Sequence, residues 1–355
     1  MSRAESPVTV ETSAVVYSLD TAKVKPQNWI WPGYIPRGGI TLLFGDPSAG
    51  KTTTGCNLIA RYTSGQSWPD GQPNGKPGSV LVMTGEDSVE RTIKPRLVAA
   101  GADCRKVTIW DRIRTKISDG TIDERLPDLA ADVDHLRAIV EGAPDLGLVL
   151  IDTLSCFLGV KDSNQQSQVR RALLPLHDLC DQTGLSLLCI GHMNKGSGGK
   201  AQYRASGSLA YIAAARSALL CAPDRDDPDC AVMAIAKCNL AQKSPSLRYR
   251  IVSCDENPEV ATVEWYGASD YSADQLLEEK KPATKTEAII EWLQDVLKDG
   301  PMHSGTVEAL ADEAGFKKRT LWEARGVAKD RGILRCNKIG FGDGAHWEWE
   351  LCRLS

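Results

Sequence analysis

The chain has 355 residues, a formal net charge of −4 at pH 7, and a composition of 42% hydrophobic and 25% charged residues. This length allows two or three domains, and the composition is ordinary for a globular protein. The net charge excludes a chain that is basic throughout and coats nucleic acid, so any contact with DNA must be local.

The 11 cysteines are odd in number and scattered, with no C-x-x-C pair and no Cys/His cluster at zinc-binding spacing. Cys56, Cys180, Cys189 and Cys221 stand in apolar surroundings, which predicts buried thiols in a reducing compartment. The sequence has no apolar N-terminal region of the signal-peptide type and no apolar run of membrane-spanning length. We therefore expect a cytoplasmic protein without membrane contact.

Apolar runs alternate with amphipathic stretches through the first part of the chain. Residues 1–27 are polar and predict a loose arm, either disordered or packed on a neighbouring subunit. The aromatic residues at 29–34 either flank an adenine base or cover the edge of a sheet. Strands are expected at residues 40–44, 80–84, 107–110, 148–151 and 185–190, and helices at 52–61, 89–100, 129–140 and 169–182.

This alternation of strands and helices predicts an α/β fold with a doubly wound, mostly parallel sheet. The pattern changes over residues 217–266, where short strands are separated by tight turns. We expect these strands, at 218–221, 232–236, 248–252 and 260–266, to form an antiparallel extension of the same sheet.

Residues 45–52, Gly-Asp-Pro-Ser-Ala-Gly-Lys-Thr, fit the phosphate-binding pattern G-x-x-x-x-G-K-[ST] between an expected strand and an expected helix. Backbone N–H groups at the start of such a helix face phosphate, and the helix dipole favours its charge. Lys51 is expected to reach the β- and γ-phosphates of ATP, and Thr52 to ligate Mg²⁺. The residues expected to bind nucleotide are Gly45, Asp46, Pro47, Ser48, Ala49, Gly50, Lys51, Thr52 and Thr53.

Three more polar residues follow expected strands directly. Asp152 ends an apolar run as a Mg²⁺-holding acid does, although it could instead cap a helix. Glu86 is our choice for the base that positions the attacking water, with Asp87 as the alternative. His192 either senses the γ-phosphate or is structural. Because the carboxyl ends of parallel strands meet at one edge of a sheet, these residues and Lys51 predict an active site there.

Two basic segments are candidates for DNA contact. The glycine-rich segment 193–206 carries Lys195, Lys200 and Arg204, and predicts either a loop on the DNA backbone or a solvated loop. Residues 267–283 predict a linker, and residues 284–355 predict a winged-helix domain of three helices and two strands. Residues 315–338 hold eight Lys or Arg against two acids, around the third helix. This excess predicts binding of duplex DNA, or else docking of a protein, through Lys317, Lys318, Arg319 and Arg325.

Residues 28–266 resemble the RecA-like ATPase core of the RepA-type replicative helicases of plasmids and phages, which are often described as AAA-family ATPases. The resemblance rests on an ordered set of motifs. These are Trp29-x-Trp31-Pro32-Gly33, the loop Gly45–Thr52, Gly85-Glu86-Asp87, Leu150-Ile151-Asp152-Thr153, Gly191-His192-x-Asn194-Lys195, Arg204-Ala205-Ser206-Gly207-Ser208 and Lys237-x-Asn239.

The resemblance implies roles that the residues alone do not give. Glu86 matches the catalytic carboxylate and His192 the sensor. Arg216 matches an arginine finger from the adjacent subunit, and Lys237 matches a second cation in trans. The family forms rings, usually hexamers, which hydrolyse ATP with Mg²⁺ and pass single-stranded DNA through the ring.

The resulting hypothesis is an ATP-hydrolysing helicase that acts in the replication of a mobile element. The sequence carries no primase-type catalytic cluster, so priming would need a separate primase. Two alternatives stay open: a RecA-like ATPase of DNA repair or recombination, and a DNA-binding regulator that uses nucleotide as a switch.

Overall fold

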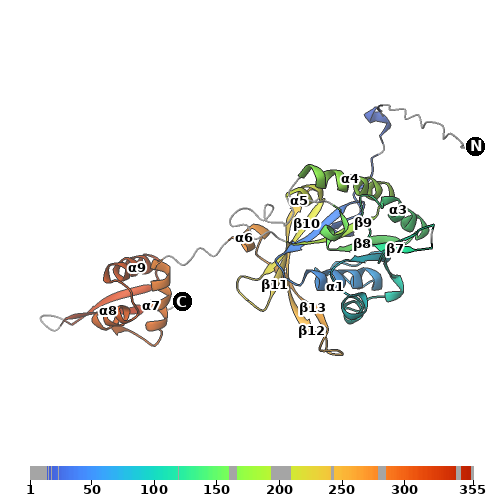
Figure 1. Cartoon of the computed structure of the whole chain (residues 1–355). Coiled ribbons are helices and arrows are strands. Elements are labelled where there is room, and N and C mark those ends of the chain that lie inside the picture. The colour runs from blue at the N-terminus through green and yellow to red at the C-terminus, as the bar shows by residue number, and fades with distance from the viewer. Residues whose placement is uncertain are drawn as a thin grey trace, which may run out of the picture. The chain divides into compact units, whose positions relative to one another are not determined.

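The computed structural model describes residues 14, 16, 18–22, 24–118, 120–159, 166–192, 209–240, 244–278, 285–340 and 345–352 (Figure 1). The chain divides into two compact units, Met1–Leu277 and Glu278–Ser355. The predicted positions Lys195, Lys200 and Arg204 lie outside the described residues. Within those residues, no helix combines the length and the apolar character needed to cross a bilayer.

One large sheet organises the first unit. In the described part of this unit, nine strands lie side by side. In spatial order they are β13 (Ala261–Ser269), β12 (Ser246–Ser253), β11 (Ala231–Cys238), β10 (Ser217–Pro223), β3 (Ile40–Gly45), β9 (Ser186–His192), β8 (Leu146–Asp152), β4 (Ser79–Thr84) and β5 (Val107–Ile109). The strands from β10 to β5 are parallel, and β11 to β13 are antiparallel. The predicted α/β fold with a mostly parallel sheet is therefore confirmed.

Helices cover both faces of this sheet (Figure 1). One face carries α1 (Lys51–Ser64) and α2 (Lys94–Ala99), which follows a π-helical turn at Val89–Ile93. The other carries α3 (Val133–Gly142), α4 (Gln166–Thr183), α5 (Leu209–Ala214) and α6 (Ala273–Leu277). Short 3-10 turns occur at Leu19–Thr21, Cys104–Lys106 and Leu154–Phe157.

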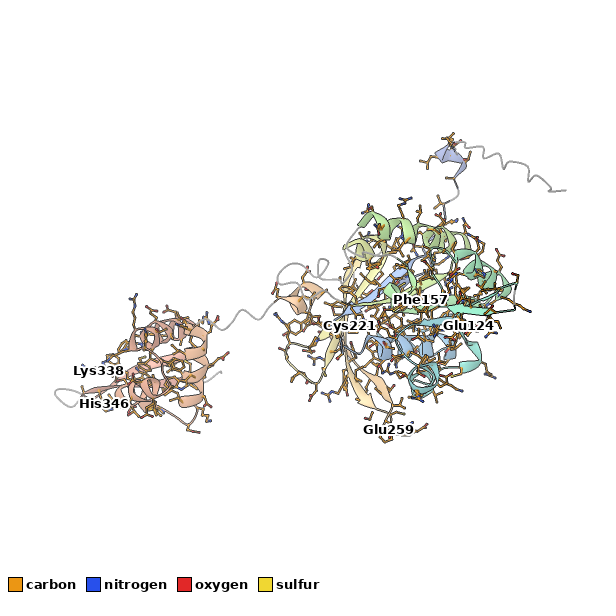
Figure 2. The ribbon with its side chains drawn as sticks, viewed as in Figure 1. Glu124, Phe157, Cys221, Glu259, Lys338 and His346 are labelled. Carbon is orange, nitrogen blue, oxygen red and sulfur yellow. The ribbon has the colours of Figure 1, made fainter. Side chains whose placement is uncertain are left out.

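Alternate side chains of each central strand pack into two separate hydrophobic cores, one on each face of the sheet. In β8, Leu148 and Leu150 belong to the core under α1, whereas Val149 and Ile151 belong to the core under α3 and α4. Figure 2 labels Phe157 in the second core, where its side chain is fully buried. Continuous apolar strands are what a parallel sheet covered on both faces requires.

Two small hairpins were not predicted from the sequence. β1 (Trp29–Trp31) pairs with β2 (Ile35–Pro36), and β6 (Ile113–Lys116) pairs with β7 (Ile122–Arg125). Trp31 stacks on Tyr34 with ring centroids 3.9 Å apart and on Trp68 at 5.2 Å, and all three are buried. These aromatic residues cover the core, so they are not free to flank a base.

Several predicted boundaries and pairings were wrong. β10 was expected in the antiparallel extension, but it is parallel to β3 because α5 carries the chain back to the start of the sheet. The helix expected at 129–140 begins at Val133, and the helix expected at 89–100 is split by its π-helical turn, with Pro95 near the start of α2. The segment expected as a linker from residue 267 instead holds the end of β13 and all of α6.

The second unit has its own core. Its elements are α7 (Lys285–Val296), β14 (Met302–His303), α8 (Ser304–Glu313), α9 (Lys318–Asp330), β15 (Leu334–Ile339) and β16 (His346–Leu351). The strands form an antiparallel sheet in the order β14-β16-β15. Ile289, Leu293, Val307, Leu321 and Trp349 meet in its interior. The three helices and last two strands match the elements expected from the sequence, whereas β14 was not expected.

Candidate active site

The strand register places the polar residues expected after β3, β4, β8 and β9 at one edge of the sheet. Gly45 at the end of β3 lies beside His192 at the end of β9, and Thr84 at the end of β4 lies beside Asp152 at the end of β8. Because these strands are parallel, their carboxyl ends, and the segments that follow them, meet at the same edge. The polar residues expected there are thus brought together by the register of the strands.

The phosphate loop joins β3 to α1 through unusual backbone angles. Ser48 has a φ of 69° and Gly50 a φ of 70°. A Cβ on Gly50 would lie 2.6 Å from Cδ1 of Ile251, and a Cβ on Gly45 would overlap the carbonyl oxygen of Cys221. Figure 2 labels Cys221, which is buried beside the loop on β10. Both glycines of the motif are therefore needed for the conformation and for the close packing of the loop.

Lys51 is the first residue of α1 and is only 5% exposed. Its Nζ donates hydrogen bonds to the carbonyl oxygens of Gly45 at 3.1 Å and Asp46 at 2.8 Å. Burial lowers the pKa of its ammonium group. The charge lies next to the free N–H groups and the positive dipole end of α1, an arrangement that attracts anions such as phosphate.

Thr52 and Asp152 form the direct link between the loop and β8. The Thr52 hydroxyl donates to Oδ2 of Asp152 at 2.7 Å. Asp152 is 2% exposed, and its burial raises the pKa of its carboxyl group to about 6, further raised by the charge of Glu86 and opposed by the Thr52 hydrogen bond. A hydroxyl and a carboxylate are oxygen ligands that Mg²⁺ favours, so this pair fits the ion.

Glu86 is turned toward Asp152 and its neighbours, whereas Asp87 is turned away. The Thr153 hydroxyl donates to Oε1 of Glu86 at 3.1 Å, and Nε2 of His192 lies 3.5 Å from Oε2 of the same carboxylate. Asp87 pairs with Arg96 at 3.2 Å instead. Of the two acids, Glu86 is therefore the one held beside Thr153 and His192 at the carboxyl edge of the sheet.

The β12 strand supplies contacts that sequence reasoning missed. Tyr249, buried in the core, donates from its hydroxyl to the carbonyl oxygen of Ala49 in the phosphate loop at 2.8 Å. On the neighbouring strand, Nε1 of Trp265 donates to Oδ1 of Asn57 in α1 at 2.9 Å. The sequence predicts both strands, but no local signal shows that they fold back onto a loop 200 residues earlier.

Arg216 and Lys237 lie at the opposite edge of the sheet. Arg216 precedes β10, where its N–H donates to the carbonyl oxygen of Ile40 at the start of β3. Since Cys221 pairs with Gly45, Arg216 lies five residues of strand before the level of the phosphate loop. At roughly 3.3 Å per residue this is about 16 Å, so Arg216 lies far from the phosphate loop of its own chain.

Lys237 is held by the end of a helix. Its Nζ donates to the carbonyl oxygens of Ile212, Ala213 and Ala215, each at 2.8 Å. Burial, and then the charge of Arg216, lower the pKa of its ammonium group. The ammonium satisfies carbonyls that the end of α5 leaves without a partner, which is a structural task.

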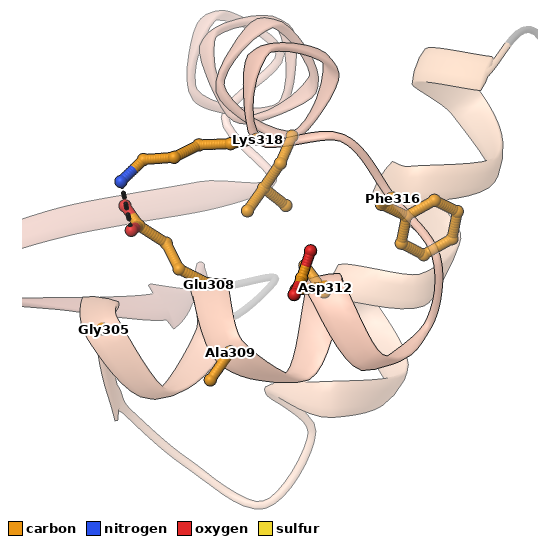
Figure 3. A pocket seen from close by; sticks show the side chains of 8 residues that line it. Gly305, Glu308, Ala309, Asp312, Phe316 and Lys318 are labelled. Atoms are coloured by element: carbon orange, nitrogen blue, oxygen red, sulfur yellow. Dashed lines mark ion pairs between the residues drawn. The ribbon is translucent and has the colours of Figure 1, made fainter.

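The basic residues predicted on the second unit are partly paired. Lys318 forms an ion pair with Glu308 at 2.8 Å across a hollow between α8 and α9 (Figure 3). Arg319 pairs with Glu323 at 3.0 Å. Arg325 lies over the ring of Trp322 at 4.3 Å, and Lys317 is exposed just before α9.

A comparison with protein families matches residues 5–198 to the AAA domain. The chain belongs to this family of P-loop ATPases. The matched range of this AAA-domain protein includes the phosphate loop, Glu86, Asp152 and His192, and it ends before Arg216 and the second unit. No curated protein matches the chain.

We predict that Tyr249→Phe weakens ATP binding. The change removes the hydroxyl that holds the Ala49 carbonyl, a hydrogen bond worth about 1 kcal/mol, so we expect the Kd for a fluorescent ATP analogue to rise about fivefold. Tyr266→Phe is the matched control, because its hydroxyl contacts Glu264 on the same hairpin. Equal Kd values for the wild type and Tyr249→Phe, with unchanged Tm, would contradict the role of Tyr249.

A second prediction concerns the buried charge of Asp152. Because burial raises the pKa of Asp152 in the folded chain, its ionised form costs stability, and this cost grows as pH rises through about 6. Asp152→Asn should therefore raise Tm in ligand-free protein above pH 6, with a smaller gain near pH 4. The same variant should lose the Mg²⁺-dependent part of ATP binding.

Asp134→Asn on α3 is the control for this experiment, because Asp134 is exposed and should change neither measurement. A lower Tm for Asp152→Asn at pH 8 would show that the Asp152 charge stabilises the fold.

Proposed function

We propose that this protein hydrolyses ATP with Mg²⁺ and works as a ring-forming motor on DNA. Within that class, we propose a replicative helicase of the RepA-like type, acting in the replication of a mobile element. The observation that carries the proposal is the division of the site between two edges of one sheet. Lys51, Asp152 and Glu86 converge at the carboxyl edge, and Arg216 stands at the other.

The carboxyl edge supplies the groups that bind and orient the nucleotide. The N–H groups of the loop and the ammonium group of Lys51 would cradle the β- and γ-phosphates. Thr52 and Asp152, already joined by a hydrogen bond, would hold the metal ion. When bound, Mg²⁺ would offset the negative charge of the phosphates.

Glu86 supplies a proton acceptor. Its side chain is 48% exposed, so its carboxylate can accept a hydrogen bond from water. Thr153 and His192 hold this carboxylate from one side, which fixes its orientation. His192, at the end of β9, also pairs with Gly45 at the end of β3 in the sheet register. This contact supports a role for His192 in reporting the state of the γ-phosphate to the segment that follows β9.

The position of Arg216 supports the proposal that the protein forms a ring. This residue is exposed, and among the described residues no carboxylate pairs with it. About 16 Å of strand separates it from its own phosphate loop, so we infer that it would stabilise the charge of a transferring phosphoryl group in another subunit. Lys237, with its donors occupied by α5, would hold the segment that carries Arg216 rather than contact phosphate itself.

The second unit supports contact with DNA. We interpret its three helices and three-stranded antiparallel sheet as a winged helix, in which α9 would be the recognition helix. Lys317, Lys318 and Arg319 stand at the start of α9, where they can meet the backbone of duplex DNA. Such contacts would make the affinity fall as salt rises.

The hydrolysis proposal is tested by Glu86→Gln. The amide keeps the shape of the side chain but cannot accept a proton, so ATP should still bind while turnover falls by at least about 100-fold. Lys51→Ala should lose ATP binding, and Asp87→Asn should stay within a fewfold of the wild type. If Asp87→Asn shows the loss instead, the assignment is wrong by one residue.

The ring is tested by mixing two inactive variants. Arg216→Ala should bind ATP and lose about 10³-fold or more in turnover, because a finger of this kind acts on charge in the transition state. Lys51→Ala keeps its finger and loses its own site. After subunit exchange, mixtures should regain activity where a Lys51→Ala subunit donates Arg216 to an intact phosphate loop.

Arg170→Ala, an exposed arginine on α4, is the control for Arg216 and should retain turnover. A monomer by light scattering with ATP, Mg²⁺ and DNA, or no rescue at any mixing ratio despite exchange, would contradict the ring and favour a nucleotide-switched regulator.

A further inference from the structure

Two tryptophans of the second unit remain at the surface. Trp322 on α9 is 42% exposed and Trp347 on β16 is 50% exposed. Among the described residues, these are the two exposed tryptophans of the chain. Tryptophan carries a large apolar ring that folded proteins usually bury or use for recognition. Two such rings on adjacent elements therefore point to a binding surface.

Trp322 belongs to a cationic stripe along α9. Lys318, Trp322, Arg325 and Lys329 follow one another at spacings of four, three and four residues, which places them on one face of the helix. The Arg325 guanidinium lies 4.3 Å from the Trp322 ring centre and 5.6 Å from that of Trp349. Nε1 of Trp322 donates to Glu308, which fixes the ring.

The hairpin of β15 and β16 continues this face. Trp347 and Trp349 alternate on β16 and therefore lie on the same side of the sheet, and Trp349 meets Trp322 edge to face at 6.1 Å. Lys338 pairs with Trp347 in the register and shares its side. Figure 2 labels Lys338 and His346 on these two strands. Glu348 and Glu350 alternate with the tryptophans, so they lie on the opposite side.

We call this set the tryptophan face: Lys318, Trp322, Arg325, Lys329, Lys338 and Trp347. Among the described residues, Lys318 pairs with Glu308, whereas Arg325, Lys329 and Lys338 form no ion pair. Burial raises the pKa of the Cys336 thiol on β15, and the nearby positive charges of Arg325 and Lys329 lower it. The face therefore combines exposed aromatic rings with uncompensated positive charge.

We propose that the tryptophan face binds single-stranded DNA, with unpaired bases stacked on Trp322 and Trp347. This proposal rests on the proposed function and adds single-stranded DNA, bound at the tryptophan face, to the duplex contact proposed for the start of α9. Bases in a duplex are stacked on each other and cannot stack on protein rings, whereas unpaired bases can, and their phosphates match the surrounding cations. A protein partner would also use Trp and Arg, but the unpaired cations favour a polyanion.

The test compares two strands that differ only in their bases. Fluorescence anisotropy of the full chain without nucleotide would give the Kd for labelled oligothymidylate and for an abasic strand of the same length. Phosphate contacts alone treat both strands equally. Stacking requires the wild type to bind oligothymidylate at least about fivefold more tightly than the abasic strand.

Variants of Trp322 and Trp347 test whether the preference for oligothymidylate over the abasic strand comes from the tryptophan face. Trp322→Ala and Trp347→Ala should each weaken oligothymidylate binding by about fivefold or more, and leave abasic binding unchanged. Trp322→Phe and Trp347→Phe keep an aromatic ring and should retain most of the affinity, which separates stacking from loss of fold. Tyr266→Ala, an exposed aromatic residue of the first unit, is the matched control and should bind both strands as the wild type does.

Three results would overturn the proposal: equal binding of the two strands by the wild type, no effect of the alanine variants on their ratio, or no binding of DNA. Binding of a protein through the same residues, with no preference for bases, would also overturn it. ATP turnover without DNA should be the same in all these variants and the wild type. If the wild type does not hydrolyse ATP, the proposed function fails, while the comparison of strands still decides the role of the face.

Discussion

The hydrogen bond between Thr52 and Asp152 joins the two segments on which the site depends. It connects the first turn of α1 to the end of β8, across 100 residues of chain. Asp152 is almost fully buried, and an unpaired carboxylate in such a place is costly unless it loses its charge or gains a partner. The pKa of the Asp152 carboxyl is raised because burial disfavours its charged form. A cation bound beside Asp152 would relieve that cost.

The sheet separates the site into two halves with different chemistry. Its carboxyl edge holds the phosphate loop, the buried acid and the exposed acid, and Arg216 and Lys237 lie at its amino edge. Lys237 donates to three carbonyl oxygens at the end of α5, whereas Arg216 is exposed. The match to the AAA domain covers the residues at the carboxyl edge and ends before Arg216 and Lys237.

Local sequence patterns predicted the features that depend on local chemistry. The phosphate loop and the apolar strand before Asp152 are visible because glycine, lysine and buried strands leave a signal within a few residues. Tyr249 and Ile251 were missed as neighbours of the loop because their contacts depend on how β12 folds back across the sheet. The parallel direction of β10 was missed for the same reason, since direction is set by the connection through α5.

The position of β10 has a mechanical consequence. Its residues from Ser217 to Ala222 are buried, and it pairs with β3 from Ser217 to Cys221. One end adjoins Arg216, and the other presses the Cys221 carbonyl against Gly45 of the phosphate loop. Under the proposed ring, this one buried strand would connect the phosphate loop of a subunit with the arginine that the subunit offers to its neighbour.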